Sequence, residues 1–376
     1  MAVRILLSPR GDPPVWTAAG EPLAFHRRLP GYAPTPLLDL GDLAADLGLG
    51  AVWVKHEAER FGLPAFKILG ASYAVFCRCV DELGPPPPWE TVADLRAWAA
   101  PLRPLTLLAA TDGNHGRAVA RSAALLGFHA SIFVPAGTAQ ARIDAIAGEG
   151  AVVTVVDGSY DDAVALAAAG AGPRDWVIAD TAWPGYEETP RRVVAGYSTM
   201  LAEADSQIAG LGRGGPDLVL AQVGVGALAA ALVLHYRAAG AGPRIVGVEP
   251  LDAACLLESV DAGRIVSVPG PHRSIMVGLN CGTPSLVAWP LLERGVDAWT
   301  AIDDGWTRAA VRLLADHSVA AGETGAAGLA GLLALLRAPE ASEARAALGL
   351  GPACRVLLIV TEGVTDPTLH QEILRS

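Results

Sequence analysis

Residues 106–126 read TLLAATDGNHGRAVARSAALL, and this stretch indicates the fold most clearly. It begins with a short, largely apolar run, which is typical of a strand buried on both faces of a parallel sheet. Small polar residues follow, and residues 115–126 form an alanine-rich segment of helical character. The stretch therefore predicts a strand, a loop and a helix, which is the repeating unit of an α/β fold.

The same order of elements recurs along the chain and predicts an α/β protein with parallel strands and crossover helices. Strands are expected at residues 52–55, 106–110, 130–134, 152–156, 176–179, 218–222, 245–248 and 355–361. Helices are expected at residues 115–126, 160–169, 227–237 and 304–317. Because residues 76–190 have their own strand-helix alternation, we expect them to form a smaller domain inserted into a larger one built from residues 1–75 and 191–376.

The composition excludes several classes of function. The 376 residues are 52% hydrophobic and 18% charged, which is typical of a packed globular protein. The formal charge of -11 and the lack of basic runs argue against a nucleic-acid partner. No apolar stretch resembles a signal-peptide core or a membrane span, so we expect a cytoplasmic protein without a membrane partner. Neither cysteines nor acidic residues show metal-ligand spacing, so no metal is expected.

The chain contains only two lysines, Lys55 and Lys67, among its 28 basic residues. Lysine can act as a nucleophile or form a Schiff base, whereas the guanidinium of arginine stays charged. The two lysines are therefore either retained for such chemistry or accidents of drift. Lys67 lies in RFGLPAFKILGASY, residues 60–73, where apolar neighbours favour a reactive amine. A helix lysine that reaches for solvent is the alternative.

Two loops at the ends of expected strands have the composition of anion-binding sites. TDGNHG at residues 111–116 and GVGAL at residues 224–228 each lead into an expected helix, whose free backbone N–H groups favour an anion. For the first loop, a simple helix cap at Asp112 or Asn114 is the alternative. The second loop lacks the fingerprints of NAD and ATP sites, so neither ligand is predicted.

The last expected strand leads into TEGVTDP at residues 361–367. A hydroxyl and acids at the carboxyl end of a parallel strand lie where open α/β sheets bind their ligands. An ordinary loop rich in turn-forming residues is the alternative.

Together these motifs resemble the fold-type II pyridoxal-phosphate enzymes, and most closely the diaminopropionate ammonia-lyases among them. The resemblance rests on motifs spread over almost the whole chain, namely RFGLPAFKILGASYA, ATDGNHGRAVA, SYDDAV, DTAWPGYEETP, SIMVGLNCGTPS, GETGA and TEGVTDP. It implies two three-layer α/β/α domains with mainly parallel twisted sheets, a pyridoxal 5'-phosphate cofactor and a homodimer.

The resemblance also implies a role for each motif. Lys67 would bind the cofactor covalently, Asn114 its ring hydroxyl, and Thr361 its pyridine nitrogen. Its phosphate would be held by the loop formed by Gly224, Val225, Gly226, Ala227 and Leu228. Asp112 and Asp180 would be catalytic acids on opposite sides of the substrate Cα, and Tyr160 would lie near the site.

The activity implied is the α,β-elimination of D- and L-2,3-diaminopropionate to pyruvate and two ammonia molecules. The departing amine must be protonated, which an acidic site favours. A serine or threonine dehydratase and a synthase that replaces the β-substituent of an amino acid are the alternatives among enzymes. A protein that binds an amino acid or the cofactor without catalysis is the alternative from another class.

The chain departs from the resembled pattern at three positions, Pro64, Ala71 and Val364, each of which could alter the fit of the substrate. Cys255 and Cys281 fall where some members of the family have a cysteine pair. A bridge between them would stabilise the enclosed loop by ~3 to 4 kcal/mol. A reducing compartment favours free thiols instead.

Overall fold

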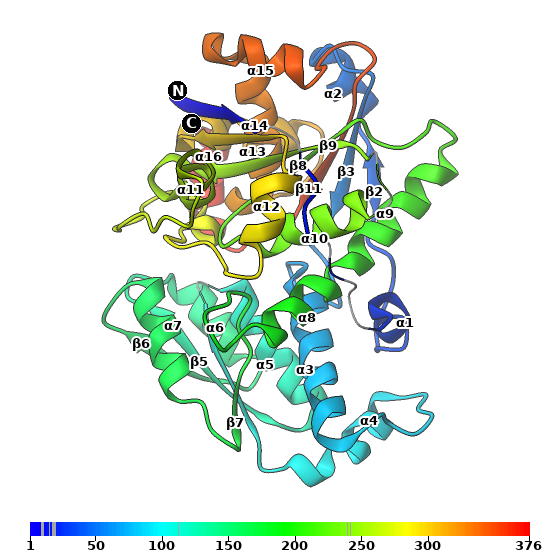
Figure 1. Cartoon of the computed structure of the whole chain (residues 1–376), viewed down its shortest axis with the longest axis vertical. Helices are drawn as coiled ribbons and strands as arrows, with labels where there is room; N and C mark the ends of the chain where they lie inside the picture. The colour runs from blue at the N-terminus through cyan, green and yellow to red at the C-terminus, as the bar shows by residue number, and fades with distance from the viewer. Residues whose placement is uncertain (9–10, 15, 17–19, 112, 239, 241) are drawn as a thin grey trace. The chain divides into compact units, whose positions relative to one another are not determined.

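The computed structural model describes residues 1–8, 11–14, 16, 20–111, 113–238, 240 and 242–376 (Figure 1). The chain divides into two compact units. Unit 1 contains residues 1–17, 34–59 and 200–376, and unit 2 contains residues 18–33 and 60–199. Each unit is built around a sheet of its own, as the alternating pattern of strands and helices predicts.

Unit 1 contains a seven-stranded sheet in the order β1-β10-β9-β8-β11-β3-β2. Its strands are β1 (Val3–Leu7), β2 (Leu37–Asp39), β3 (Ala51–His56), β8 (Leu218–Gln222), β9 (Arg244–Pro250), β10 (Ala298–Ile302) and β11 (Arg355–Val360). The five inner strands pair in parallel, and only the edge strands β1 and β2 run antiparallel. Strands β8 and β10 are buried along their whole length because helices cover both faces of the sheet.

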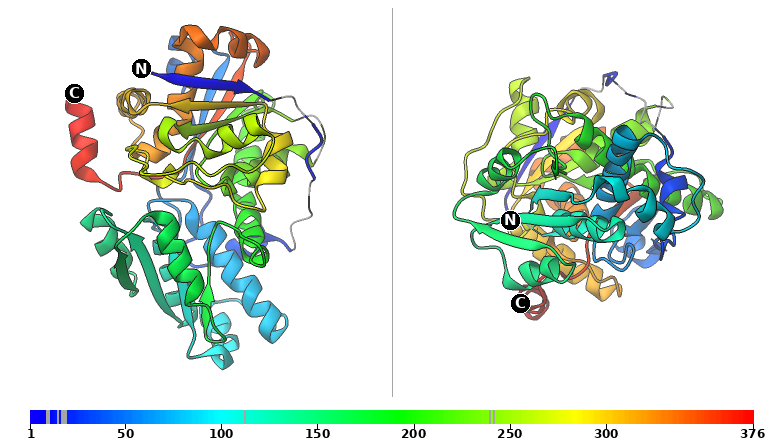
Figure 2. Two further views of the ribbon diagram at one scale, coloured as in Figure 1. Left: turned by 60° about the vertical axis from the view of Figure 1, so that its left-hand side comes forward. Right: turned by 90° about the horizontal axis from the view of Figure 1, so that it is seen from below.

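Helix α14 is the central helix of unit 1 and contacts β8, β9, β10 and β11. It is apolar around most of its circumference and almost entirely buried, as expected of a helix enclosed by other elements. Helix α10 contacts β8 and β9, and α16, drawn red in Figure 2, packs against α13. The helices that lie wholly or mainly in unit 1 are α2 (Gly41–Asp46), α9 (Ser198–Gly210), α10 (Ala227–Arg237), α11 (Cys255–Ala262), α12 (Trp289–Gly295), α13 (Asp304–Asp316), α14 (Glu323–Arg337), α15 (Ser342–Ala347) and α16 (Pro367–Arg375).

Unit 2 contains a parallel four-stranded sheet in the order β6-β5-β4-β7. Its strands are β4 (Thr106–Ala110), β5 (His129–Pro135), β6 (Val152–Val156) and β7 (Asp175–Val177). Helices α3 and α5 share one apolar core with β4 and β5, whereas α7 packs on β4 and β5 through a separate small cluster. The helices are α1 (Pro22–His26), α3 (Lys67–Leu83), α4 (Val92–Trp98), α5 (Asn114–Leu126), α6 (Gln140–Ala147), α7 (Tyr160–Ala169) and α8 (Glu188–Gly196).

The compact units and the domains expected from the sequence differ at their edges. The expected boundary at residue 75 falls inside α3, which runs unbroken from Lys67 to Leu83. The structure assigns all of α3 and α8 to unit 2, because these two helices pack closely on each other. Residues 60–75 and 191–199 therefore belong to the same unit as the four-stranded sheet.

All the expected strands are present within a few residues of their predicted bounds, and β4, β6 and β8 match them fully. The expected helices 160–169 and 227–237 also match, as α7 and α10. The prediction missed β1, β2 and β10, and it did not identify α3 as a helix. Along the described chain, no helix combines the length and the apolar character needed to cross a bilayer.

Candidate active site

Lys67 is the first residue of α3 and follows the tight turn in which Arg60 pairs with Leu63. Its neighbours Phe66, Ile68 and Leu69 are buried in the core, whereas the lysine side chain retains 25% of its exposure. The Nζ atom donates to Oδ2 of Asp180 at 2.5 Å. The apolar neighbours favoured a reactive amine, and the structure adds a carboxylate partner that is 113 residues away in sequence.

Asp180 lies just beyond β7 in a segment that a half-buried tyrosine, Tyr186, holds in place. The hydroxyl of Tyr186 donates to the carbonyl of Val177 at 2.7 Å and accepts from the N–H of Ala179 at 3.0 Å. The ring of Tyr186 stacks on Trp183 with their centroids 4.3 Å apart. Burial raises the pKa of Tyr186 to about 12, so its hydroxyl keeps its proton at neutral pH.

Asp180 has two basic neighbours within unit 2. Besides Lys67, Nδ1 of His115 lies 3.9 Å from Oδ2 of the carboxylate. The other ring nitrogen, Nε2, lies 2.7 Å from the carbonyl of Ile178, which can only accept, so Nε2 carries a proton. Burial by itself would raise the pKa of Asp180, but the charges of Lys67 and His115 outweigh it and hold that pKa well below its usual range. Asp180 is therefore an anion at neutral pH.

Tyr197 is the fourth member of this buried polar cluster. Helices α3 and α8 approach each other at Gly70 and Gly196, where a Cβ on Gly196 would lie 2.4 Å from the carbonyl oxygen of Leu69. This glycine contact lets the ring of Tyr197 pack against Phe66, with their centroids 4.6 Å apart. Burial raises the pKa of the Tyr197 phenol, and the positive charge of Lys67 opposes that rise.

The loop between β4 and α5 contains two of the predicted site residues. Asp112 lies outside the described residues. Asn114 is half-buried and is the first residue of α5. The N–H of Gly113 donates to Oγ1 of Thr111 at 2.9 Å, just before the N-terminus of α5. Tyr160, predicted to lie near the site, is the first residue of α7.

In unit 1 the predicted phosphate loop connects β8 to α10. Gly226 has a φ of 103°, and a Cβ there would lie 2.6 Å from Cδ1 of Leu292. A Cβ on Gly224 would come within 3.2 Å of Sγ of Cys281 and of the carbonyl oxygen of Gly278. Both positions therefore favour glycine, which leaves the backbone of these two residues without side chains at a helix N-terminus. This arrangement fits a bound phosphate.

Two thiols lie beside this loop. Cys255 donates to the carbonyl of Gly224 at 3.7 Å, and Cys281 is buried close to the same glycine. No disulfide bridge joins these two cysteines in the structure.

Thr361 is buried directly after β11, and its Oγ1 accepts a hydrogen bond of 2.8 Å from Nε2 of Gln222. The parallel pairing of β8 with β11, in which Leu220 is level with Leu358, brings the carboxyl ends of these strands together. A threonine hydroxyl that accepts one bond still has a proton to donate. The side chain therefore fits a partner such as an unprotonated ring nitrogen.

The three departures from the resembled pattern lie in different environments. Ala71 is a residue of α3 and is fully buried in the core of unit 2. Pro64 is half-buried in the turn before Lys67, and Val364 is half-buried in the loop after Thr361.

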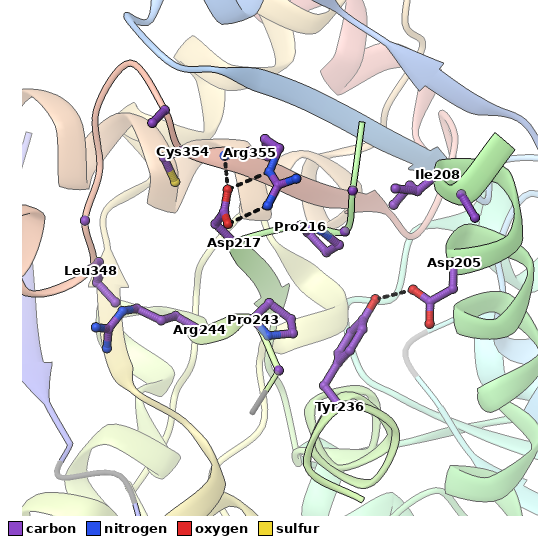
Figure 3. Close-up of a pocket in the computed structure, with 16 residues that line it drawn as sticks. Asp205, Ile208, Pro216, Asp217, Tyr236, Pro243, Arg244, Leu348, Cys354 and Arg355 are labelled. Carbon is purple, nitrogen blue, oxygen red and sulfur yellow. Dashed lines mark hydrogen bonds and ion pairs between the residues drawn. The ribbon is translucent and has the colours of Figure 1, made fainter. Parts of the chain in front are cut away.

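A separate cavity of about 910 Å³ lies at the amino ends of the parallel strands of the seven-stranded sheet, opposite to Thr361 and the loop at residues 224–228 (Figure 3). Its lining includes residues that precede β8, β9 and β11, such as Asp217. The ion pair between Asp217 and Arg355 is part of this lining. Because parallel sheets bind ligands at the carboxyl ends of their strands, this cavity is not the candidate active site. None of the described site residues predicted from the sequence lines it.

Sequence reasoning missed three residues of the candidate active site, namely His115, Tyr197 and Gln222. His115 lies inside a motif that was singled out and Gln222 ends the expected strand at residues 218–222, but their partners are distant in sequence. Tyr197 has no local signal beyond the glycine that precedes it.

Comparison with known proteins agrees with the resemblance. The sequence profile of the family described as "Pyridoxal-phosphate dependent enzyme" matches residues 28–361. Diaminopropionate ammonia-lyase of Salmonella typhimurium is 37% identical over 373 residues, which cover 94% of this chain and 91% of that protein.

Solved structures of the Escherichia coli diaminopropionate ammonia-lyase are also similar to the chain. The complex with D-serine has a TM-score of 0.89 and 33% identity, over 99% of this chain and 97% of that one. The complex with an aminoacrylate-PLP azomethine reaction intermediate has a TM-score of 0.87 and 34% identity, again over 99% and 97%.

Proposed function

The chain belongs to the family of pyridoxal-phosphate-dependent enzymes, and we propose that it is an ammonia-lyase that converts 2,3-diaminopropionate to pyruvate and two ammonia molecules. The observation that carries the proposal is the likeness to diaminopropionate ammonia-lyases over almost the whole chain, in sequence and in fold. The pairing of a lysine with a buried carboxylate, Lys67 with Asp180, supplies the groups that such chemistry requires.

The described residues fit a bound pyridoxal phosphate. Lys67 would hold its aldehyde carbon, and Asn114 its ring hydroxyl. The backbone N–H groups of the loop at residues 224–228 would hold its phosphate, and Thr361 would donate to its pyridine nitrogen. When bound, the cofactor draws negative charge away from the substrate Cα.

Asp180 is the proton acceptor in this proposal. Its carboxylate accepts a hydrogen bond from Nζ of Lys67, so it is placed to take the proton that the lysine loses when it acts as a nucleophile. Loss of the lysine charge removes the main influence that lowers the pKa of Asp180, so the carboxylate becomes a better proton acceptor at that point. Nδ1 of His115 lies 3.9 Å from the same carboxylate as a second basic group. Tyr197 keeps its proton and closes the cluster on the side of α8.

We further propose that both enantiomers are substrates, with Asp112 and Asp180 serving opposite faces of the Cα. For Asp180, burial beside a lysine supports this role. For Asp112 the support is its place in the sequence motif TDGNHG. Anionic side chains also stabilise the ammonium form in which the β-amino group must leave, whereas serine loses a neutral hydroxyl group as water.

Product stoichiometry tests the proposal. The purified, cofactor-loaded protein is supplied with D- or L-2,3-diaminopropionate, L-serine or L-threonine, and ammonia and 2-oxo acid are counted. We expect two ammonia molecules per pyruvate from diaminopropionate of either hand, and slower release from the hydroxy amino acids. Turnover of serine or threonine alone, with one ammonia per oxo acid, would instead identify a dehydratase. A requirement for an added nucleophile would identify a synthase.

The assembly and the location of the protein are also proposals. We propose a homodimer in the cytoplasm, on the basis of the family resemblance. Light scattering of the purified protein would give twice the 38.6 kDa chain mass for a homodimer. A mass of one chain would contradict it.

A further inference from the structure

Gln222 is a buried amide at the carboxyl end of β8, just before the phosphate loop. Only 3% of the residue is exposed to solvent. Its nitrogen Nε2 lies 2.8 Å from Oγ1 of Thr361 and 2.8 Å from the carbonyl oxygen of Ile359. The carbonyls of Thr324 and Gly325 lie slightly farther away, at 3.2 and 3.3 Å. The side chain therefore links β8 to the end of β11 and the start of α14.

The direction of the bond to Thr361 follows from these neighbours. Three of the four oxygens near Nε2 belong to backbone carbonyls, which accept hydrogen bonds and cannot donate them. The amide group must therefore turn its nitrogen toward them, since its oxygen in that place would be repelled. Nε2 consequently donates to Oγ1 of Thr361, and the hydroxyl of Thr361 keeps its own proton for another acceptor.

We propose that Gln222 is a positioning residue that fixes Thr361 as a hydrogen-bond donor to the pyridine nitrogen of the cofactor. A donor at that place is compatible only with an unprotonated nitrogen, because a protonated one would need an acceptor. Gln222 thus keeps the ring a moderate rather than a full electron acceptor, which favours elimination over transfer of the amino group to the cofactor. This inference rests on the cofactor assignment of the proposed function.

Nitrogen NMR of the loaded protein tests the proposal directly. The protein is loaded with pyridoxal phosphate labelled with ¹⁵N in the ring, and the ring resonance is compared between the wild type and Gln222→Met, which keeps the side-chain length. We expect an unprotonated, hydrogen-bonded nitrogen in the wild type. In the variant the Thr361 hydroxyl loses the donor that orients it, so its oxygen can accept from a protonated ring nitrogen and the resonance should shift toward the protonated position.

A second pair of variants shows whether Gln222 acts through Thr361. Thr361→Val removes the hydroxyl at constant shape, and adding Gln222→Met to it should shift the ring resonance no further. Gln207→Met is the matched control, because Gln207 also donates to a backbone carbonyl in unit 1, that of Thr35, and does not touch Thr361. An unchanged ring resonance in Gln222→Met would overturn the proposal. So would a shift on Gln222→Met that is equally large in the wild type and in Thr361→Val.

The hydrogen bond can also be tested without cofactor or substrate. The chain has four glutamines, so ¹⁵N-glutamine labelling gives four side-chain amide signals. The Gln222 signal should exchange slowly with water and should move in Thr361→Val. A signal that does not respond would overturn the inference even in a protein that binds no cofactor. If that signal and the ring resonance both respond but diaminopropionate is not turned over, the proposed substrate fails and the role of Gln222 stands.

Discussion

The two lysines of the chain show how different surroundings give the same side chain different roles. Lys55 is fully buried on β3, where its Nζ donates to the carbonyl of Thr35 at 2.7 Å. Nζ also donates to Glu203 and Gln207, each at 2.9 Å. Lys67 retains a quarter of its exposure and is the first residue of α3, with Asp180 at 2.5 Å.

The two lysines differ in whether the amine can lose its proton and react with a bound cofactor. The three acceptors around Lys55 match the three N–H bonds of an ammonium group, so this lysine is held as a cation. Lys67 has access to solvent and a carboxylate able to take its proton. The small number of lysines in the sequence made both positions candidates for a reactive amine. Only their surroundings in the structure separate the structural lysine, Lys55, from the reactive one, Lys67.

The largest effect is expected at Lys67. Lys67→Arg keeps a cation beside Asp180 but cannot form a Schiff base. The variant should therefore lack the yellow chromophore, and its turnover should fall by ~10³-fold or more. Absorbance and pyruvate release measure both, and thermal unfolding checks that the fold is intact. A folded Lys67→Arg that keeps the chromophore would assign the cofactor to another residue.

Asp180→Asn should lower kcat by ~10² to 10⁴-fold while leaving the cofactor bound, because an amide cannot accept the proton. If Asp112 serves the opposite face of the substrate, the two enantiomers of diaminopropionate should be affected unequally. Separate assays with each enantiomer measure this. Equal losses for both would contradict the two-acid arrangement.

Lys55→Met should affect the fold rather than the chemistry. Removing one partner of a buried ion pair leaves Glu203 without its cation, which costs about 3 to 5 kcal/mol of stability. Denaturant unfolding measures the loss, and turnover per bound cofactor should stay within about twofold. Adding Glu203→Leu should recover part of the stability. A loss of cofactor binding in a folded Lys55→Met would erase the distinction between the lysines.

The smallest effect is expected at the exposed ion pair in Figure 3. Hydrogen bonds from Arg355 hold the pKa of Asp217 below its usual range, so the pair stabilises the fold above about pH 4 and the contribution is lost as the pH falls further. The side chain of Asp217 is 43% exposed, so Asp217→Asn should cost only ~0.2 to 1 kcal/mol at neutral pH. Unfolding at pH 7 and pH 3 checks this, and a loss that persisted at pH 3 would contradict it.

The sequence predicted the strands and loops well because their signals are local. Residues 106–110 and 218–222 are short apolar runs followed by glycine-rich loops, and both are strands with the predicted bounds. The edge strand β2 was missed because three residues give too short a pattern. The compact units differ from the expected domains at their edges, because the glycine contact between α3 and α8 has no local sequence signal.

The candidate site was predictable only in part for the same reason. The motifs identified Lys67, Asn114, the loop at residues 224–228 and Thr361 as chemically suited groups. They did not identify the pairing of Lys67 with Asp180 or of Gln222 with Thr361, because these partners are 113 and 139 residues apart. Such contacts depend on the packing of whole elements.

Mapping the covalently bound cofactor tests the distinction between the two lysines most directly. The loaded protein is reduced with borohydride, digested and analysed by mass spectrometry. The unmodified forms of the two lysine-containing peptides serve as the internal reference. We expect a phosphopyridoxyl group on the peptide that contains Lys67 and an unmodified peptide that contains Lys55. A label on Lys55, or a bound cofactor that leaves both lysines unmodified, would contradict it.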